Sequence, residues 1–219
     1  MDTHLNDKEW AALIRAHPEL ASIPQRLRDY ATDVRAATSD ILYRIGAKPK
    51  SMLFVVEGEI RLVRRARNGA EIVLQRATAG FLAEASIDAT RYHCDVVAGR
   101  DSRIVAFPIE RFRKALHDDE GFRDFWMMRL ARELRKLRGQ SERLSLRGVA
   151  ERIEHYIEAE GNNGRIELRQ TKKAWAAELG ITHEALYRAL SRLVRGGRLT
   201  TQERGDALVL IIRSNAKQS

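Results

Sequence analysis

The segment MLFVVEGEIRLVRRARNGAEIVLQ, residues 52–75, is rich in Val, Ile, Leu and Phe, and within it Ile60 and Leu62 alternate with charged neighbours. A period of two is typical of β-strands that bury one face. Within this segment, Asn68-Gly69 accepts the positive φ angles that a tight hairpin turn requires, and Gly58 indicates a bend or a bulge. The segment therefore predicts a β-hairpin.

A second β-like segment, YHCDVVAGRDSRIVAFP at residues 92–108, predicts two more strands around Gly99. Several short strands with turns between them favour an antiparallel sandwich or small barrel, here over about residues 37–108. The first forty residues show helical spacing instead, which Pro18 and Pro24 interrupt. We therefore expect short helices followed by a β domain.

A heptad pattern follows between Gly121 and Leu146. Its positions are alternately three and four residues apart, and all are apolar except one serine. Charged residues flank this seam, so we expect it to face a partner helix, most simply in a second copy of the chain. A seam this short can also pack on the chain's own β domain. Gly139 lowers helix stability by roughly 1 kcal/mol relative to Ala, so a structural reason for it is expected. The predicted dimer interface consists of Met127, Leu130, Leu134, Leu137, Ser141 and Leu144.

Two short helices with a glycine turn between them are predicted near the C-terminus. Thr171 can cap the helix KKAWAAEL, which ends at Gly180, and Thr182 can cap the helix HEALYRALSRL. This arrangement is a helix-turn-helix. The segments GRLTTQ and ALVLIIR on either side of ERGD then predict a two-stranded wing.

The polar face of the second helix carries residue types that can read base edges in a DNA major groove. Glu184 can accept a hydrogen bond from a cytosine amino group, and Arg188, one turn later, can bind a guanine. The alternative is that the two form an i,i+4 ion pair on a solvated helix. The predicted base-reading residues are His183, Glu184, Tyr187 and Arg188; those predicted to contact phosphates are Thr171, Lys172, Lys173, Thr182, Arg192 and Arg195.

Composition is consistent with this reading. The chain has 219 residues, of which 44% are hydrophobic, so it can bury a core. Its 39 Lys and Arg exceed its 30 Asp and Glu, for a formal net charge of +9. This excess points weakly to nucleic acid or an anionic membrane, and it can also serve solubility alone. No apolar run approaches membrane-spanning length and the first residues lack a signal-peptide pattern, so we expect a cytoplasmic protein without a membrane partner.

Candidate catalytic and metal chemistry is sparse. Cys94 is the single cysteine, so neither an intrachain disulfide nor an iron–sulfur cluster held by four thiolates of one chain can form. The sequence has no glycine-rich phosphate loop and no metal-ligand cluster. We therefore expect a protein that is not an enzyme, with neither a metal site nor catalytic residues.

The segments LFVVEGEIRLV, GFLAEAS and LGITHEALYRALSRL resemble the CRP/FNR family of bacterial transcription regulators over nearly the whole chain. The resemblance implies an α+β protein with an antiparallel β-sandwich or jelly roll of the cyclic-nucleotide-binding type and N-terminal helices (residues 1–108). A dimerisation helix (109–145) and a winged helix-turn-helix (146–219) would follow. It further implies a homodimer that binds a palindrome in double-stranded DNA through Glu184 and Arg188, and that works with RNA polymerase.

The family's nucleotide site has a Glu for the ribose hydroxyl and an Arg-Ser pair for the phosphate. Glu84 matches the Glu, but the Arg-Ser position falls at Tyr92-His93, and Arg91, one residue away, would face the other side of a strand. Because the strongest charge-assisted contact is missing, cyclic AMP is not expected. The segment GFLAEAS also lacks the His or Cys of haem-binding members, so haem is not expected.

Glu84, Tyr92, His93 and Cys94 form the candidate sensor pocket. His93 and Cys94 together suggest a soft metal or a thiol trigger, although neighbours on a strand face opposite ways and a lone cysteine often simply packs in a core. The alternative function is therefore a ligand-binding or redox-sensing module whose winged helix contacts protein rather than DNA.

Overall fold

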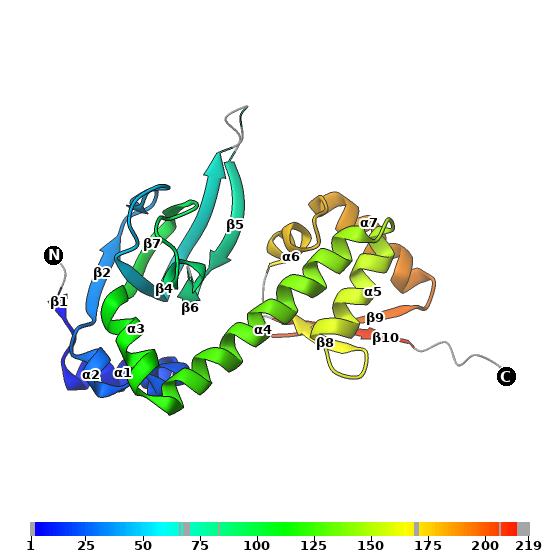
Figure 1. The fold of residues 1–219 in the computed structure, drawn as a ribbon. Helices are drawn as coiled ribbons and strands as arrows, with labels where there is room; N and C mark the ends of the chain where they lie inside the picture. The colour runs from blue at the N-terminus through cyan, green and yellow to red at the C-terminus, as the bar shows by residue number, and fades with distance from the viewer. Residues whose placement is uncertain are drawn as a thin grey trace. The chain divides into compact units, whose positions relative to one another are not determined.

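The computed structural model describes residues 3–65, 67, 71–82, 84–168, 171–205 and 207–213 (Figure 1). The chain divides into two compact units, Met1–Met128 and Arg129–Ser219, and each is described by itself. The predicted turn residues Asn68 and Gly69 lie outside the described residues. The functional division at residues 108 and 145 remains a prediction.

The first unit is built on an antiparallel sheet, as predicted. Its strand order is β1-β2-β7-β4-β5, with β3 also paired to β7 and β6 to β4. The predicted hairpin is present, because β4 pairs with β5 and brings Arg65 opposite Glu71. The strands are β1 (Thr3–His4), β2 (Thr32–Ala36), β3 (Ile41–Tyr43), β4 (Ser51–Arg65), β5 (Glu71–Ala77), β6 (Gly80–Leu82) and β7 (Asp95–Pro108).

The apolar run at the start of β4 is buried on both faces of the sheet. Met52 and Phe54 contribute to one core cluster, and Leu53 and Val55 contribute to another. Successive side chains of a strand point to opposite faces, so one strand serves both clusters. This explains why the beginning of β4 is continuously apolar, whereas its later part alternates.

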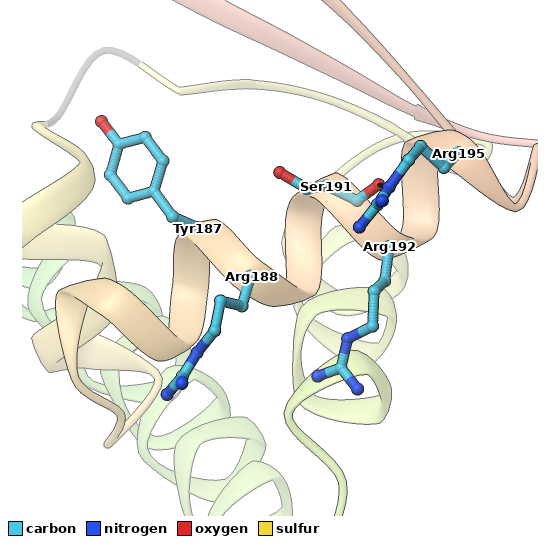
Figure 2. A pocket seen from close by; sticks show the side chains of 5 residues that line it. All are labelled: Tyr187, Arg188, Ser191, Arg192 and Arg195. Carbon is cyan, nitrogen blue, oxygen red and sulfur yellow. Dashed lines mark hydrogen bonds between the residues drawn. The ribbon is translucent and has the colours of Figure 1, made fainter.

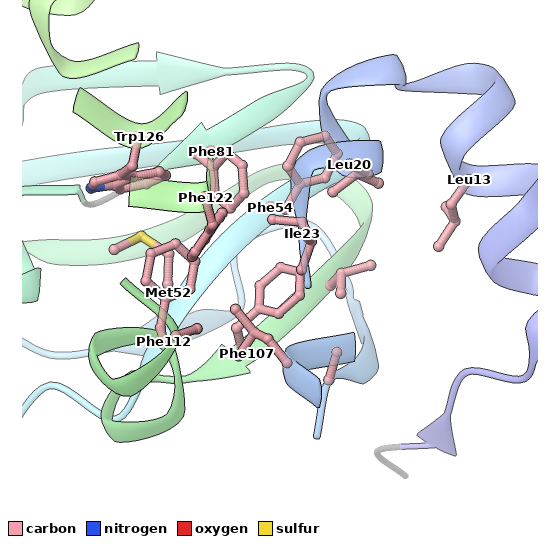
Figure 3. Close-up of a cluster of buried hydrophobic side chains, with 14 of the residues drawn as sticks. Leu13, Leu20, Ile23, Met52, Phe54, Phe81, Phe107, Phe112, Phe122 and Trp126 are labelled. Carbon is pink, nitrogen blue, oxygen red and sulfur yellow. The ribbon is translucent and has the colours of Figure 1, made fainter. Parts of the chain in front are cut away.

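Short helices and aromatic rings cover one of these faces (Figure 3). Phe81 on β6 and Phe112 each contact Trp126, with ring centroids 5.0 and 4.9 Å apart. Edge-to-face contacts of this kind add about 0.5–1.5 kcal/mol each beyond area burial. The first turns of α4 are therefore fixed to the sheet. The helices of this layer are α1 (Asp7–Ala16), η1 (Pro18–Ser22), α2 (Gln25–Arg28), α3 (Ile109–Asp118) and the start of α4 (Glu120–Ser145).

Two expectations for this unit were wrong. Residues 32–36 form β2 rather than helix, because the strand pairs with β7 and an ion pair of 2.9 Å joins Asp33 to Arg103. The segment around Gly99 is part of one strand, β7, and not a turn between two. A Cβ at Gly99 would collide with the Glu59 carboxylate, so this glycine permits a close approach across the sheet.

Gly58 interrupts β4 as predicted. Its φ is +95°, and the pairing of β4 with β7 shifts register on both sides of it, which is the signature of a bulge. A Cβ here would collide with Ser102 and with the carbonyl of Asp101. Glycine is therefore required both by conformation and by space.

The predicted seam is an exposed stripe on α4. Its five apolar members are 38–62% exposed, and Ser141 is exposed as well. A Cβ at Gly139 would lie 3.4 Å from Nη1 of Arg143, an ordinary van der Waals distance, so no steric reason for this glycine is found within the described residues. Arg143 itself is buried and pairs with Glu160 at 3.2 Å.

The second unit packs helices on a three-stranded sheet of order β8-β10-β9. The wing strands β9 and β10 were expected. Strand β8 was missed, because its four residues carry too short an alternation to be recognised. Trp175, Leu186 and Leu210 are fully buried between the layers. The elements are α5 (Val149–Glu160), β8 (Arg165–Leu168), α6 (Lys172–Glu178), α7 (His183–Arg195), β9 (Leu199–Arg204) and β10 (Ala207–Ile212).

None of the helices in the described part of the chain has both the length and the apolar character that a membrane span requires.

Replacing Gly58 with alanine is expected to lower the free energy of unfolding of the β domain by about 3–4 kcal/mol, because backbone strain and a steric clash act together. Gly46 is a matched control: its φ is +81°, but a Cβ there would have no atom within 4 Å, so Gly46→Ala should cost only about 1–2 kcal/mol. Urea unfolding followed by circular dichroism measures both. If the two substitutions lowered the free energy of unfolding equally, the expected clash between a Cβ at position 58 and Ser102 would be contradicted.

Candidate functional site

The turn between α6 and α7 is closed by two backbone hydrogen bonds. The amide of Gly180 donates to the Ala177 carbonyl at 3.1 Å, and the amide of Ile181 donates to the Ala176 carbonyl at 3.0 Å. This pair of bonds is the Schellman motif, which needs a left-handed residue after the helix end. Gly180 supplies it with a φ of +66°. The glycine turn of the predicted helix-turn-helix is therefore present.

Both predicted caps are formed. The Thr171 hydroxyl accepts a hydrogen bond from the Ala174 amide at 3.2 Å, and the Thr182 hydroxyl accepts one from the Ala185 amide at 3.1 Å. Each cap satisfies one of the free amides at the start of its helix. Both threonines, which were also predicted to contact phosphates, remain exposed at these helix starts.

Helix α7 has one buried and one exposed face. Leu186, Leu190 and Leu193 lie in the core of the second unit. The opposite face borders a shallow groove, and Figure 2 shows its side chains projecting from the helix. The groove is lined by Tyr187, Arg188, Ser191, Arg192 and Arg195.

Glu184 and Arg188 are exposed on α7, one turn apart. No hydrogen bond or ion pair holds either side chain within the described residues, so the i,i+4 ion pair considered for them does not form there. The carboxylate of Glu184 lies in the first turn, where the helix dipole favours a negative charge. Both groups are thus free to bind an external partner.

Tyr187 connects the two helices of the pair. The ring of His183 meets it edge-on, with centroids 4.6 Å apart. The ammonium of Lys172, on α6, lies 5.2 Å from the centroid of the same ring. Two predicted base-reading residues and one predicted phosphate contact therefore form a single cluster at the start of α7.

The C-terminal half of the exposed face is strongly basic. Arg188, Arg192 and Arg195 follow one another at helical spacing, and all three are exposed. Like charges three or four residues apart destabilise a helix slightly, and a polyanion on this face would offset that cost. Lys173, also predicted to contact phosphate, is exposed at the start of α6.

The sensor candidates do not all share one environment. Glu84 begins η2 (Glu84–Ile87) and is buried, and Nε2 of Gln75 on β5 donates to its Oε2 at 3.4 Å. Sequence reasoning missed Gln75, although its place on the strand that pairs with β4 was a usable signal. Ser191 was missed as well, and its spacing of four from both Tyr187 and Arg195 could have identified it.

Tyr92 fills the position where the resemblance would place an arginine. Its ring is buried and stacks on Tyr43, with centroids 4.8 Å apart. Its hydroxyl accepts a hydrogen bond from the Lys50 amide at 3.3 Å and donates to the Ser51 carbonyl at 3.5 Å. Burial, and secondarily Tyr43, raises the pKa of Tyr92 to about 12. Tyr92 is therefore a neutral structural residue here, with its polar group occupied by backbone.

His93 and Cys94 face different environments: His93 is exposed, whereas Cys94 is buried in a core cluster. Burial raises the pKa of the Cys94 thiol, and a thiol with a raised pKa is a poor nucleophile at neutral pH. Within the described residues, no group of three or more His, Cys, Asp or Glu side chains is placed to hold a metal ion. The structure thus separates the two residues that suggested a joint trigger.

Comparison with known proteins supports this architecture. Residues 33–119 match the family model of the cyclic nucleotide-binding domain. A search of curated protein sequences finds no match. FixK2 from Bradyrhizobium japonicum has a similar structure, with a TM-score of 0.56 and 20% identity over 84% of this chain and 93% of that one.

Two further solved structures have the same fold. The c-di-GMP responsive global regulator CLP of Xanthomonas campestris is 19% identical, with a TM-score of 0.56 over 88% of this chain and 99% of that one. DNR from Pseudomonas aeruginosa is 20% identical, with a TM-score of 0.53 over 96% of each chain. The chain therefore contains a cyclic nucleotide-binding domain and has the fold of the CRP/FNR family of transcription regulators.

Proposed function

We propose that the protein is a homodimeric transcription regulator that reads a palindromic DNA operator with α7. The observation that carries the proposal is that Glu184 and Arg188, which have no ion-pair partner among the described residues, lie one turn apart on an exposed helix that follows a glycine turn. A carboxylate can accept a hydrogen bond from cytosine N4, and a guanidinium can donate two to guanine O6 and N7. Together they can recognise a G·C pair.

The surrounding charges would set the position of the helix on the duplex. Arg192, Arg195, Lys172 and Lys173 extend the basic surface along and beside α7. Contacts of such side chains with phosphates give affinity and register but little sequence information. His183 and Tyr187, which contact each other, would then meet the bases next to the G·C pair.

A palindrome requires two copies of the helix, and the seam on α4 supplies a way to bring them together. Its leucines and methionine are exposed in the single chain, whereas seams of this spacing are normally buried against another helix. Pairing two copies would place the recognition helices about one DNA turn apart. A shift between the paired helices would change this separation and so control binding.

We further propose that the β domain works without cyclic AMP, haem or an iron–sulfur cluster. The resemblance puts Tyr92 where the family has its phosphate-binding arginine, the hydroxyl of Tyr92 is bound to backbone, and a single cysteine cannot hold a cluster. The protein would then act on promoters in the cytoplasm, together with RNA polymerase, and would not be an enzyme.

Arg188→Ala is expected to remove the preference for the operator while leaving weak, salt-sensitive binding. A bidentate arginine–guanine contact contributes about 1–3 kcal/mol of discrimination. Arg195→Ala is the control, because losing a phosphate contact should weaken binding to all sequences alike and reduce the salt slope by about one per chain. Gel-shift titrations against operator and scrambled duplexes measure both effects, and an unchanged preference in Arg188→Ala would contradict the base-reading role.

Leu134→Asn is expected to raise the dimer dissociation constant by about 100-fold, because a dimer buries two such leucines at about 1.5 kcal/mol or more each. Arg132→Asn changes an exposed residue of the same helix outside the seam and should leave the constant unchanged. Sedimentation velocity over a concentration series measures it. A monomeric wild-type chain, or equal effects of the two substitutions, would refute the seam as the interface.

Calorimetric titration with cyclic AMP is expected to show no saturable heat in the micromolar range, because the phosphate would lack its charged partner. The same titration on a nucleotide-binding relative serves as the positive control. Micromolar binding to this chain would overturn the reading of Tyr92.

A further inference from the structure

The guanidinium of Arg152 lies between two helix ends. Arg152 is on α5; its Nε donates to the Leu146 carbonyl at 2.9 Å and its Nη2 donates to the Leu144 carbonyl at 3.4 Å. Its Nη1 donates to the carbonyls of Leu179 and Gly180, each at 3.3 Å. Leu144 lies in the last turn of α4 and Leu146 follows the end of that helix, whereas Leu179 and Gly180 belong to the turn that leads into α7.

These carbonyls are the natural partners of a cation. The last carbonyls of a helix lack amide donors within the helix and carry the negative end of its dipole. A guanidinium is a planar fork with five N–H donors, so one arginine can serve two helix ends at once. A lysine ammonium is a single compact charge and would serve one of them.

A packing contact joins the same two elements. A Cβ at Gly180 would lie only 2.6 Å from Cδ2 of Leu144. Leu144 is the last member of the seam, and Gly180 is the residue whose left-handed conformation begins the path into α7. The end of the seam therefore packs directly against the turn, and Arg152 binds the carbonyls of both.

We propose that Arg152 is a positioning residue that fixes the direction of α7 relative to α4. In a dimer joined along α4, this direction sets the separation of the two recognition helices. The half-site spacing of the operator would then be selected by a side chain that does not touch DNA. The inference concerns the same site as the proposed function and rests on it for its consequence in DNA binding, but the geometry within one chain can be tested without DNA.

The first test measures the distance between α4 and α7 in the full chain. Spin labels are placed at Arg135→Cys and Val194→Cys, two exposed positions outside the seam and the groove, in a Cys94→Ala background. The labelled chain is mixed with an excess of unlabelled chain, so that pulsed electron resonance reports distances within one chain. Arg152→Met is expected to broaden the distance distribution. An unchanged distribution would overturn the proposal.

Two further variants separate positioning from general loss of stability. Arg147→Met is the matched control, because Arg147 is exposed and has no hydrogen-bond or ion-pair partner in the described part of the chain; it should leave the distribution narrow. Arg152→Lys keeps the charge without the fork and should broaden the distribution less than Arg152→Met. If Arg152→Met fails to fold, the distance distribution of Arg152→Lys tests the proposal instead. A distribution as narrow as that of the wild-type chain in Arg152→Lys would then overturn it.

The second test uses operators whose half-sites are moved apart or together by one or two base pairs. The wild-type chain should prefer one spacing, and Arg152→Met should reduce that preference by about tenfold, in the range typical of coupling between sites, while keeping the preference for the half-site sequence. Loss of half-site preference with intact spacing preference would contradict the proposal. If the wild-type chain binds all DNA equally, the proposed function fails, and the distance measurement still decides the role of Arg152.

Discussion

The exposed helix α7 depends on a single backbone conformation. At Gly180 the chain takes a left-handed turn that most residues resist, and the two hydrogen bonds of the Schellman motif become possible only there. The turn ends α6, allows Thr182 to cap α7, and orients the leucines of α7 toward the core and its charged residues toward solvent. The exposure of Glu184 and Arg188 depends on this orientation.

In the β domain, the sheet is buried on both of its faces. β4 presents successive apolar residues to two clusters, and Gly58 and Gly99 allow close approach where β4 and β7 pair. In the same domain the buried ring of Tyr92 stacks on Tyr43, and its hydroxyl forms hydrogen bonds with the backbone of Lys50 and Ser51. This polar side chain is therefore satisfied by neighbours within the chain.

Much of the fold could be predicted from the sequence, because the patterns that indicate its elements extend over only a few residues. The alternation of β4, the heptads of α4, and the caps at Thr171 and Thr182 act over a few residues. The misses share a physical cause. β2 and β8 are too short to show a period and exist because a partner strand satisfies their backbone groups. Gly99 looked like a break between two strands, but it makes room for the Glu59 carboxylate, which comes from the neighbouring strand β4.

In the candidate site, too, some features could be predicted from the sequence and others depend on the three-dimensional structure. Residue types and helical spacing were sufficient to nominate the exposed face of α7, since that face is a property of one helix. The absence of a Glu184–Arg188 ion pair among the described residues and the contact between Lys172 and Tyr187 depend on side-chain geometry. Arg152 carried no signal in the sequence, because its partners are backbone carbonyls that any residue would provide.

The open stripe on α4 also bears on how such a protein could be regulated. When assembly is weak, the amount of dimer grows with the square of the amount of chain, so that doubling synthesis gives about four times as much dimer. Operator occupancy would then respond steeply to expression and degradation. A cell could switch the target promoters through protein turnover alone, with no small molecule entering the β domain.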